Sequence, residues 1–185
     1  EVLLAKLSEF EKRLPSCDAV LFSDYGKGGL KHISEMIRLA RAAGKVVLVD
    51  PKGDDYSIYS GATLITPNRS EMREVVGRWK DDAELESKAV ALREKLDLQA
   101  LLVTRSEEGM SLFHAGGAIH EKAVAREVYD VSGAGDTVIA TLAVMLACGA
   151  PWAEAIHVAN MAAGVVVGKL GTAVCSREEL EAALK

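Results

Sequence analysis

One short segment combines an acidic residue with the small residues that a phosphate-binding turn needs. It reads Asp-Val-Ser-Gly-Ala-Gly-Asp-Thr from Asp130 to Thr137 and leads directly into an apolar stretch. Two glycines and an alanine leave backbone N–H groups uncovered, and the amino terminus of a helix adds partial positive charge. A carboxylate among such amides, here Asp136, suits a base that removes a hydroxyl proton during phosphoryl transfer.

A purely structural interpretation of this segment stays open, because a Gly-Ala-Gly turn also makes a tight strand-to-helix connection. An acidic residue near a helix start often serves only as an N-cap. Asp136 comes late for that position, and Ser132 or Asp130 suits it better.

Polar residues also follow several apolar, strand-like runs of the chain. They are Asp24, Asp50-Pro51-Lys52, Asn68 and Thr104. In a parallel sheet, ligands bind beyond the carboxyl ends of the strands, so chemistry is expected at this row of residues.

Each of these positions also has a structural interpretation. Asn68 with Glu71 three residues later matches a capping box. Asp24 suits either substrate contact or a cap on the turn after its strand, and Lys52 suits either nucleotide phosphates or a pair with Asp50. Lys27 lacks the spacing of a Walker loop, so it belongs either to a solvated loop or to a site for a sugar phosphate.

Apolar periodicity predicts an α/β fold that positions these residues. Apolar strands alternating with helices indicate a mostly parallel sheet covered on both faces, with an antiparallel hairpin at one edge. The predicted helices are 2–14, 30–43, 70–79, 83–96, 133–148, 152–169 and one opening at the capping box of Ser176; the predicted strands are 19–22, 45–49, 62–65, 100–103, 111–114 and 118–123.

Composition narrows the class of protein further. The 22 Lys and Arg residues are outnumbered by 27 Asp and Glu residues and are not clustered, which argues against a nucleic-acid partner. The three cysteines lie far apart and are expected to be small buried hydrophobes. No apolar run is long enough to span a membrane and no signal peptide is visible, so we expect a cytoplasmic protein without a membrane partner.

The segment from Asp130 to Asp136 resembles the signature of the ribokinase-like (PfkB) carbohydrate kinases. Asn68 to Glu71 resembles the Asn-x-x-Glu motif of that family, in the correct order. The likeness covers essentially the whole chain, and one departure is Thr141, where the family usually has Ala or Gly. Three further runs are similar to the heptose 7-phosphate kinase branch: 24–28, 50–53 and 170–174.

This resemblance implies a ribokinase-like three-layer α/β/α fold and a role for each matching residue. Asp136 corresponds to the catalytic base, while Gly133, Ala134 and Gly135 correspond to the anion hole for the transferring phosphoryl group. The loop that holds the nucleotide phosphates and ribose corresponds to Thr104, Ser106 and Gly109, and Asn160 corresponds to the position beside the adenine.

Cation and acceptor sites are implied in the same way. Asn68 and Glu71 match the pair that positions Mg²⁺, largely through its waters. Asp130 and the 168–172 loop resemble a site for a monovalent cation such as K⁺. Lys52 is expected near the nucleotide, and Asp24 and Lys27 near the sugar phosphate.

The implied activity is transfer of the γ-phosphate of ATP to the 1-hydroxyl of heptose 7-phosphate, which feeds ADP-heptose and lipopolysaccharide synthesis. Another acceptor alcohol, or a non-catalytic nucleotide-binding role, remains an alternative. The sugar-binding and lid region and the adenylyltransferase domain are not found in residues 1–185. We therefore expect the nucleotide-binding part of a kinase domain, weak phosphorylation by this chain alone, and an exposed sheet edge that favours a homodimer.

Overall fold

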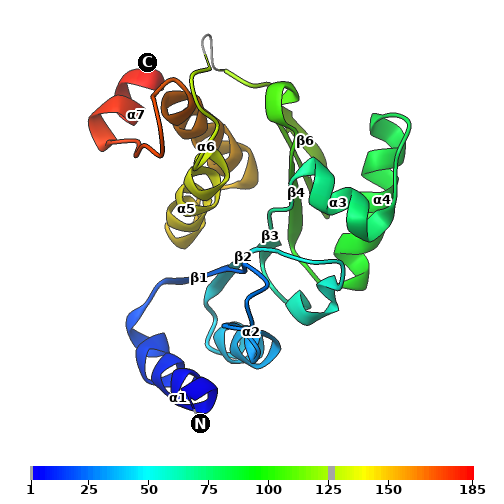
Figure 1. The fold of residues 1–185 in the computed structure, drawn as a ribbon, viewed down its shortest axis with the longest axis vertical. Helices are drawn as coiled ribbons and strands as arrows, with labels where there is room; N and C mark the ends of the chain where they lie inside the picture. Colours follow the sequence, from blue (N-terminus) through cyan, green and yellow to red (C-terminus); the bar gives the residue numbers. More distant parts are fainter. Residues whose placement is uncertain (1, 125–127) are drawn as a thin grey trace. The chain divides into compact units, whose positions relative to one another are not determined.

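The computed structural model describes residues 2–124 and 128–185, and its elements alternate as an α/β fold requires (Figure 1). The helices are α1 (Val2–Arg13), α2 (Ile33–Ala42), α3 (Arg69–Val76), α4 (Asp82–Lys95), α5 (Ala134–Ala147), α6 (Trp152–Val167) and α7 (Arg177–Ala183), with short 3-10 helices η1 (Leu14–Ser16), η2 (Tyr56–Tyr59) and η3 (Ser106–Glu108). The strands are β1 (Ala19–Ser23), β2 (Val46–Asp50), β3 (Leu64–Ile65), β4 (Ala100–Thr104), β5 (Met110–His114) and β6 (Gly117–Glu121).

The six strands form one sheet in the order of the chain, β1 to β6. Strands β1 to β4 pair in parallel, with Ser23 opposite Asp50 and Leu64 opposite Ala100. The links from β4 to β5 and from β5 to β6 are too short for a parallel crossover, so these strands run antiparallel. The predicted α/β class, with a mostly parallel sheet and an antiparallel edge, is confirmed.

The chain divides into two compact units. The first extends to Val103 and includes Leu112–Ala118, and the second contains Thr104–Ser111 and Ile119–Lys185. In the first unit, β2 and β3 are almost wholly buried, which explains why their sequences are apolar without alternation. In the second unit, α5 packs along α6, and α6 contacts α7 (Figure 1).

Helix ends follow the local chemistry of the sequence. Gly44 has φ +68° directly beyond α2, as a glycine at a helix end should. Capping boxes open both α3, with Asn68 and Glu71, and α7, with Ser176 and Glu179. The predicted start of the second helix at Leu30 was wrong by three residues, because turns occupy the segment up to His32.

Two other predictions needed correction. The strand predicted over 62–65 is regular only at Leu64–Ile65. Thr63 still makes strand-like hydrogen bonds, because its N–H donates to the Val47 carbonyl and its carbonyl accepts from the Ala100 N–H. None of the cysteines is buried: Cys148 is exposed, and Cys17 and Cys175 are intermediate. Cys148 ends α5, and Cys175 precedes α7.

Across the described residues, we find no helix with the length and apolar character needed to cross a membrane.

Candidate functional site

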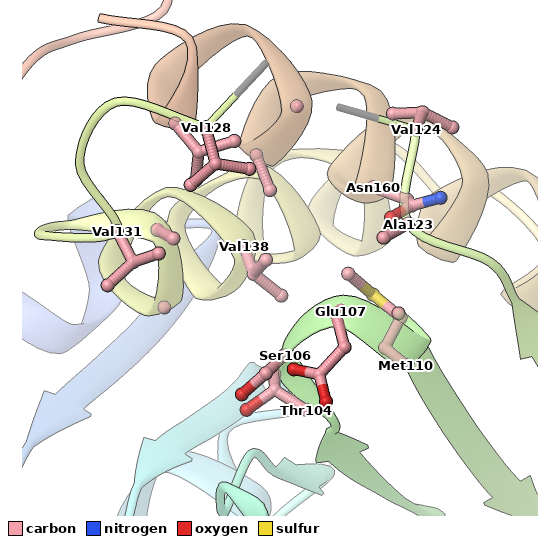
Figure 2. A pocket seen from close by; sticks show the side chains of 16 residues that line it. Thr104, Ser106, Glu107, Met110, Ala123, Val124, Val128, Val131, Val138 and Asn160 are labelled. Carbon is pink, nitrogen blue, oxygen red and sulfur yellow. The ribbon is translucent and has the colours of Figure 1, made fainter. Parts of the chain in front are cut away.

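A pocket of about 500 Å³ opens within the second unit (Figure 2). This is the size of a typical small-molecule site. It is lined by Thr104, Ser106, Glu107, Gly109, Met110, Ala123, Val124, Val128, Val131, Ala134, Gly135, Val138, Asn160, Ala163, Gly164 and Val167.

The two sides of this pocket differ in polarity. Thr104, Ser106 and Glu107 lie together on one side, on β4 and η3 (Figure 2). Val131 and Val138 lie opposite them, so an apolar surface faces a group of oxygen atoms. Such a pocket suits a ligand with one flat apolar part and one hydrogen-bonding part.

The loop that carries the polar side is held in an unusual conformation. Ser106 has φ +56° and Gly109 has φ +88°. A Cβ atom on Gly109 would lie 2.0 Å from the carbonyl oxygen of Glu121, so only glycine fits there. Backbone strain in a loop beside a pocket is a common feature of ligand-binding sites.

Asn160 is the buried polar side chain of the pocket, with an exposed fraction of 3%. Its Nδ2 donates to the carbonyl of Lys122 at 2.8 Å and to the Glu121 carboxylate at 3.3 Å. These bonds orient the side chain of Asn160 on α6.

Among the described residues, no side chain caps the amino terminus of α5. Its N-cap is Gly133, in the left-handed conformation with φ +79°. The expectation that Ser132 or Asp130 would be the cap was wrong, because Asp130 Oδ1 accepts a bond from the Ser132 N–H at 2.8 Å instead. Ala134 and Gly135, the next two residues, line the pocket.

Asp136 lies in the first turn of α5 and is exposed. Its carboxylate makes no hydrogen bond or ion pair with any other residue of 2–124 or 128–185. It therefore does not act as an N-cap, and its oxygens are available to another group.

Asp130 lies close to the 168–172 loop. Bonds from Ser132 and from the Gly171 backbone lower the pKa of the Asp130 carboxyl. The backbone N–H groups of Tyr129 and Asp130 also donate to the carbonyl of Val167. The Asp130 carboxylate therefore places a negative charge beside this loop, and a cation site requires such a charge.

A second cluster, in the first unit, surrounds the start of α3. Asn68 Oδ1 accepts from the Glu71 N–H at 3.0 Å, and Glu71 Oε2 accepts from the Asn68 N–H at 2.9 Å. Glu71 Oε1 pairs with Lys52 Nζ at 3.1 Å, and this bond raises the pKa of Lys52. The capping-box interpretation of Asn68 and Glu71 is therefore correct, whatever else these residues do.

Asp24 lies at the carboxyl end of β1, with both carboxylate oxygens bonded. Oδ1 accepts from the Gly26 N–H at 2.8 Å, and Oδ2 accepts from the Tyr59 hydroxyl at 2.8 Å. The interpretation of Asp24 as a turn cap is thus correct. Asp24 also lines a smaller pocket, of about 290 Å³, with Ser23, Tyr25, Lys27, Gly29 and Leu30.

Comparison with known proteins places this chain in a family. The sequence profile of the pfkB family carbohydrate kinases matches residues 4–179. The chain belongs to the pfkB family of carbohydrate kinases.

Relatives and solved structures agree with that assignment. A D-beta-D-heptose 7-phosphate kinase from Bordetella bronchiseptica is 58% identical over 169 residues, which are 91% of this chain and 54% of that protein. The bifunctional protein HldE of Methylococcus capsulatus is 55% identical over 179 residues, which are 96% of this chain and 38% of that protein. This pfkB-family chain thus spans about half, or less, of the length of these relatives.

Solved structures show the same fold. Arabidopsis thaliana ribokinase, solved with ribose and ATP, matches with a TM-score of 0.85 at 24% identity and covers 96% of this chain and 59% of that one. Phosphofructokinase-2 from Escherichia coli, solved with potassium, matches with a TM-score of 0.80 at 19% identity, covering 95% and 61%. The ribokinase-like fold of this pfkB-family chain is confirmed.

The structure sorts the predicted site residues into groups. Those that line the larger pocket are Thr104, Ser106, Gly109, Ala134, Gly135 and Asn160. In the first unit, Glu71 bonds to both Lys52 and Asn68, and Asp24 and Lys27 line the smaller pocket. Gly133 and Asp136 lie at the start of α5 without lining the larger pocket.

Sequence reasoning missed several residues of these sites. The valines of the larger pocket were missed because apolar lining residues look like core residues in a sequence, and Glu107 was missed because it belongs to no motif. Tyr59 was also missed, since no helix or strand was predicted for the segment between Lys52 and Ala62. The Asp55-x-Ser57 pattern that starts η2 was the available signal, as Asp55 accepts from the Ser57 N–H.

Magnesium fits the α3 cluster only through water. The oxygens of Asn68 and Glu71 already accept protein hydrogen bonds, although each retains capacity for a further donor. In the described part of the chain, no three His, Cys, Asp or Glu side chains come together as a metal site. A hard cation that keeps part of its water shell can still be held by such outer oxygens.

Proposed function

We propose that the protein transfers the γ-phosphate of ATP to the 1-hydroxyl of heptose 7-phosphate. The observation that carries this proposal is the open amino terminus of α5, whose residues Ala134 and Gly135 line a pocket of nucleotide size. Membership in a carbohydrate kinase family gives the reaction class, and the relatives named heptose 7-phosphate kinase and HldE support the acceptor.

In the proposed mechanism, the larger pocket holds the nucleotide. The adenine lies against the valines near Asn160, and the loop of Thr104, Ser106 and Gly109 binds ribose and phosphates. The turn from Gly133 to Gly135 stabilises the charge that develops on the transferring phosphoryl group. Within it, the Ala134 N–H donates to the Val131 carbonyl at 3.2 Å, which leaves the N–H groups of Gly133 and Gly135 for the phosphoryl oxygens.

Asp136 takes the proton of the attacking hydroxyl in this mechanism. Its freedom from protein partners supports the assignment, because a base must reach the hydroxyl rather than cap a helix. The acceptor uses the smaller pocket, with Asp24 toward sugar hydroxyls and the Lys27 ammonium toward the sugar phosphate.

Mg²⁺ supplies charge neutralisation at the phosphates when it is bound. We assign it to Asn68 and Glu71 through water, with Lys52 able to exchange its pairing from Glu71 to a phosphate. Asp130 and the 168–172 loop are assigned to a monovalent cation, supported by the closeness of Asp130 to the Gly171 backbone.

We also propose where the protein acts, which part of the kinase domain residues 1–185 supply, and its oligomeric state. The protein acts in the cytoplasm, where ATP and sugar phosphates are found, and contributes to ADP-heptose formation. Residues 1–185 supply the nucleotide-binding part of the kinase domain. We also include a homodimer in the proposal; in the sheet of residues 1–185, β1 is an edge strand.

The test is turnover by the complete gene product that contains these residues. We expect phosphorylation of heptose 7-phosphate and little turnover of ribose or fructose 6-phosphate. Asp136→Asn should lower turnover by about 10²- to 10⁴-fold with unchanged ATP affinity. Glu154→Gln is the matched control, because Glu154 is an exposed acid at the same position of the first turn in α6.

The outcomes separate the parts of this proposal. Strong turnover of ribose but not of heptose phosphate would replace the acceptor and keep the kinase. Equal activity of Asp136→Asn and Glu154→Gln would remove Asp136 from the mechanism. ATP binding without turnover of any acceptor would favour a nucleotide-binding role.

A further inference from the structure

Tyr59, on η2, places its hydroxyl between two polar segments of the first unit. The side chain is wholly buried, with an exposed fraction of 0%. Its oxygen accepts a bond from the Lys52 N–H at 3.0 Å, and its single proton faces Asp24 Oδ2 at 2.8 Å and the Lys52 carbonyl at 3.0 Å. One hydroxyl therefore satisfies groups from both segments.

These two segments follow neighbouring strands. Asp24 follows β1 and Lys52 lies two residues beyond β2, and the Asp24 N–H donates to the Asp50 carbonyl at 3.0 Å. Beyond these bonds, Asp24 reaches the smaller pocket and Lys52 reaches Glu71. The residues that we assign to the acceptor and to the phosphates are thus tied to the same buried hydroxyl.

We infer that Tyr59 is a positioning residue, whose hydroxyl fixes the Asp24 carboxylate and the Lys52 peptide in the arrangement that receives a sugar phosphate. This inference rests on the proposed function. Asp24 needs such support, because a carboxylate that rotates freely loses its geometry toward the hydroxyls of a ligand. With Tyr59 and Gly26 each using one oxygen, the carboxylate still has capacity for two sugar hydroxyls.

Tyr56 is a control built into the same short helix. Its exposed fraction is 2%, and its ring packs edge-on against Tyr59 with 5.5 Å between the ring centroids. Its hydroxyl has no hydrogen-bond partner among residues 2–124 and 128–185. Tyr56→Phe and Tyr59→Phe therefore each remove one buried oxygen, and only the second breaks bonds.

The test compares the complete gene product that contains these residues with its Tyr59→Phe and Tyr56→Phe variants, each labelled with ¹⁵N. Amide exchange at Lys52 and Gly26 reports the hydrogen bonds, and titration with heptose 7-phosphate reports affinity. Tyr59→Phe should speed exchange at Lys52 and weaken sugar-phosphate binding about tenfold or more, as expected for lost bonds to a charged group. Tyr56→Phe should change affinity by less than about twofold, because it breaks no bond.

Other outcomes overturn the inference in distinguishable ways. Equal sugar-phosphate affinity of the two variants would show that Tyr59 does not position the site. No binding of heptose 7-phosphate by the unchanged complete gene product would contradict the proposed acceptor, and Tyr59 would lose its role with it.

A double-variant cycle covers the case in which Tyr59→Phe disturbs the fold. In an Asp24→Ala background, Tyr59→Phe should add less than about a twofold loss, because its effect acts through Asp24. A full tenfold loss in that background would indicate a general structural role and overturn the inference.

Discussion

Helices α3 and α5 both follow a motif of the kinase family, yet they begin in opposite ways. At α3, the side chains of Asn68 and Glu71 satisfy the N–H groups of the first turn, and Lys52 pairs with Glu71. At α5, Gly133 provides no side chain, and Asp130 bonds to Ser132 instead. The N–H groups at a helix start need partners. At α5 the Ala134 N–H donates to the Val131 carbonyl at 3.2 Å, and the other N–H groups of the first turn are available to an anion.

The comparison shows which kind of residue each region depends on. The start of α3 depends on particular side chains, and the region around the larger pocket depends on particular glycines. Changes at α3 should therefore lower stability mainly by the loss of caps. Changes near the pocket should act through backbone strain, close contact and ligand binding.

The largest effect on stability is expected for Gly109→Ala. The added Cβ would lie 2.0 Å from the Glu121 carbonyl oxygen, in a backbone with φ +88°. We expect a loss of about 3 kcal/mol or more, from overlap together with strain. Gly77→Ala, at the end of α3, is the control, since Gly77 has φ +77° but open space around its Cβ.

Urea unfolding of both variants checks this prediction. Gly77→Ala should lose only about 1–2 kcal/mol, from strain alone. Equal losses for the two glycines would show that the contact at Gly109 is relieved by movement of the loop.

The next prediction compares the two capping boxes, which should contribute similarly to stability but differ in their effect on magnesium. Asn68→Ala/Glu71→Ala should lower the free energy of unfolding by about 2 kcal/mol, and Ser176→Ala/Glu179→Ala at α7 by a similar amount. Only the α3 variant should also lose the magnesium dependence of nucleotide binding. Calorimetric titration of both variants, with and without Mg²⁺, provides the measurement.

A loss of magnesium dependence in the α7 variant as well would attribute the effect to stability. Retained dependence in the α3 variant would leave Asn68 and Glu71 as a cap alone.

At the start of α5, stability and binding should change in opposite directions. Gly135→Ala should stabilise the protein by up to about 1 kcal/mol, because alanine favours helix and the Cβ has open space. The same methyl group enters the pocket wall and should weaken nucleotide binding. Gly133→Ala should instead destabilise by about 1–2 kcal/mol, since φ is +79°.

Denaturation and nucleotide titration of the same samples test this pair. Unchanged nucleotide affinity in both variants would contradict the assignment of the α5 terminus to phosphate.

The smallest expected effect is a loss of stability of helix α7 at low pH. The Lys169 ammonium, with the Ser176 backbone, lowers the pKa of Glu179 below its ordinary value of 4.5. A lowered pKa contributes stability that is present above the ordinary value and is lost as the pH falls through the folded value. Helix α7 should therefore fray below about pH 4.5 in the unchanged chain.

Glu179→Gln should lose this part of the pH dependence. Amide exchange in α7 between pH 3 and 6, values chosen to bracket the ordinary pKa of about 4.5, compares the two. An identical profile in the variant would contradict the assignment.

The fold was largely predictable because its signals are local. Apolar runs marked β1, β2 and β4, and Ser-x-x-Glu marked α7. The start of α2 was less predictable, because Leu30 is apolar yet lies in turns. The burial of cysteines failed because Cys148 lies at a helix end, where composition says nothing of exposure.

The candidate site was predictable where a motif carries it. Asp136 and Gly133 came from one segment, and Asn68 with Glu71 came from another. The hydroxyl of Tyr59 and the valines of the pocket were not predictable, because their partners lie far away in the sequence. Residues that are joined by long-range hydrogen bonds do not form a recognisable spacing pattern in a single sequence.

The central claim is that the open terminus of α5 binds the phosphates of a nucleotide. The most direct measurement is titration of the ¹⁵N-labelled chain with a non-hydrolysable ATP analogue and Mg²⁺. We predict saturable shifts of the amides of Gly133, Ala134 and Gly135, together with those of the Ser106–Gly109 loop. Unmoved α5 amides at millimolar nucleotide, in a chain whose circular dichroism shows it folded, would contradict the claim.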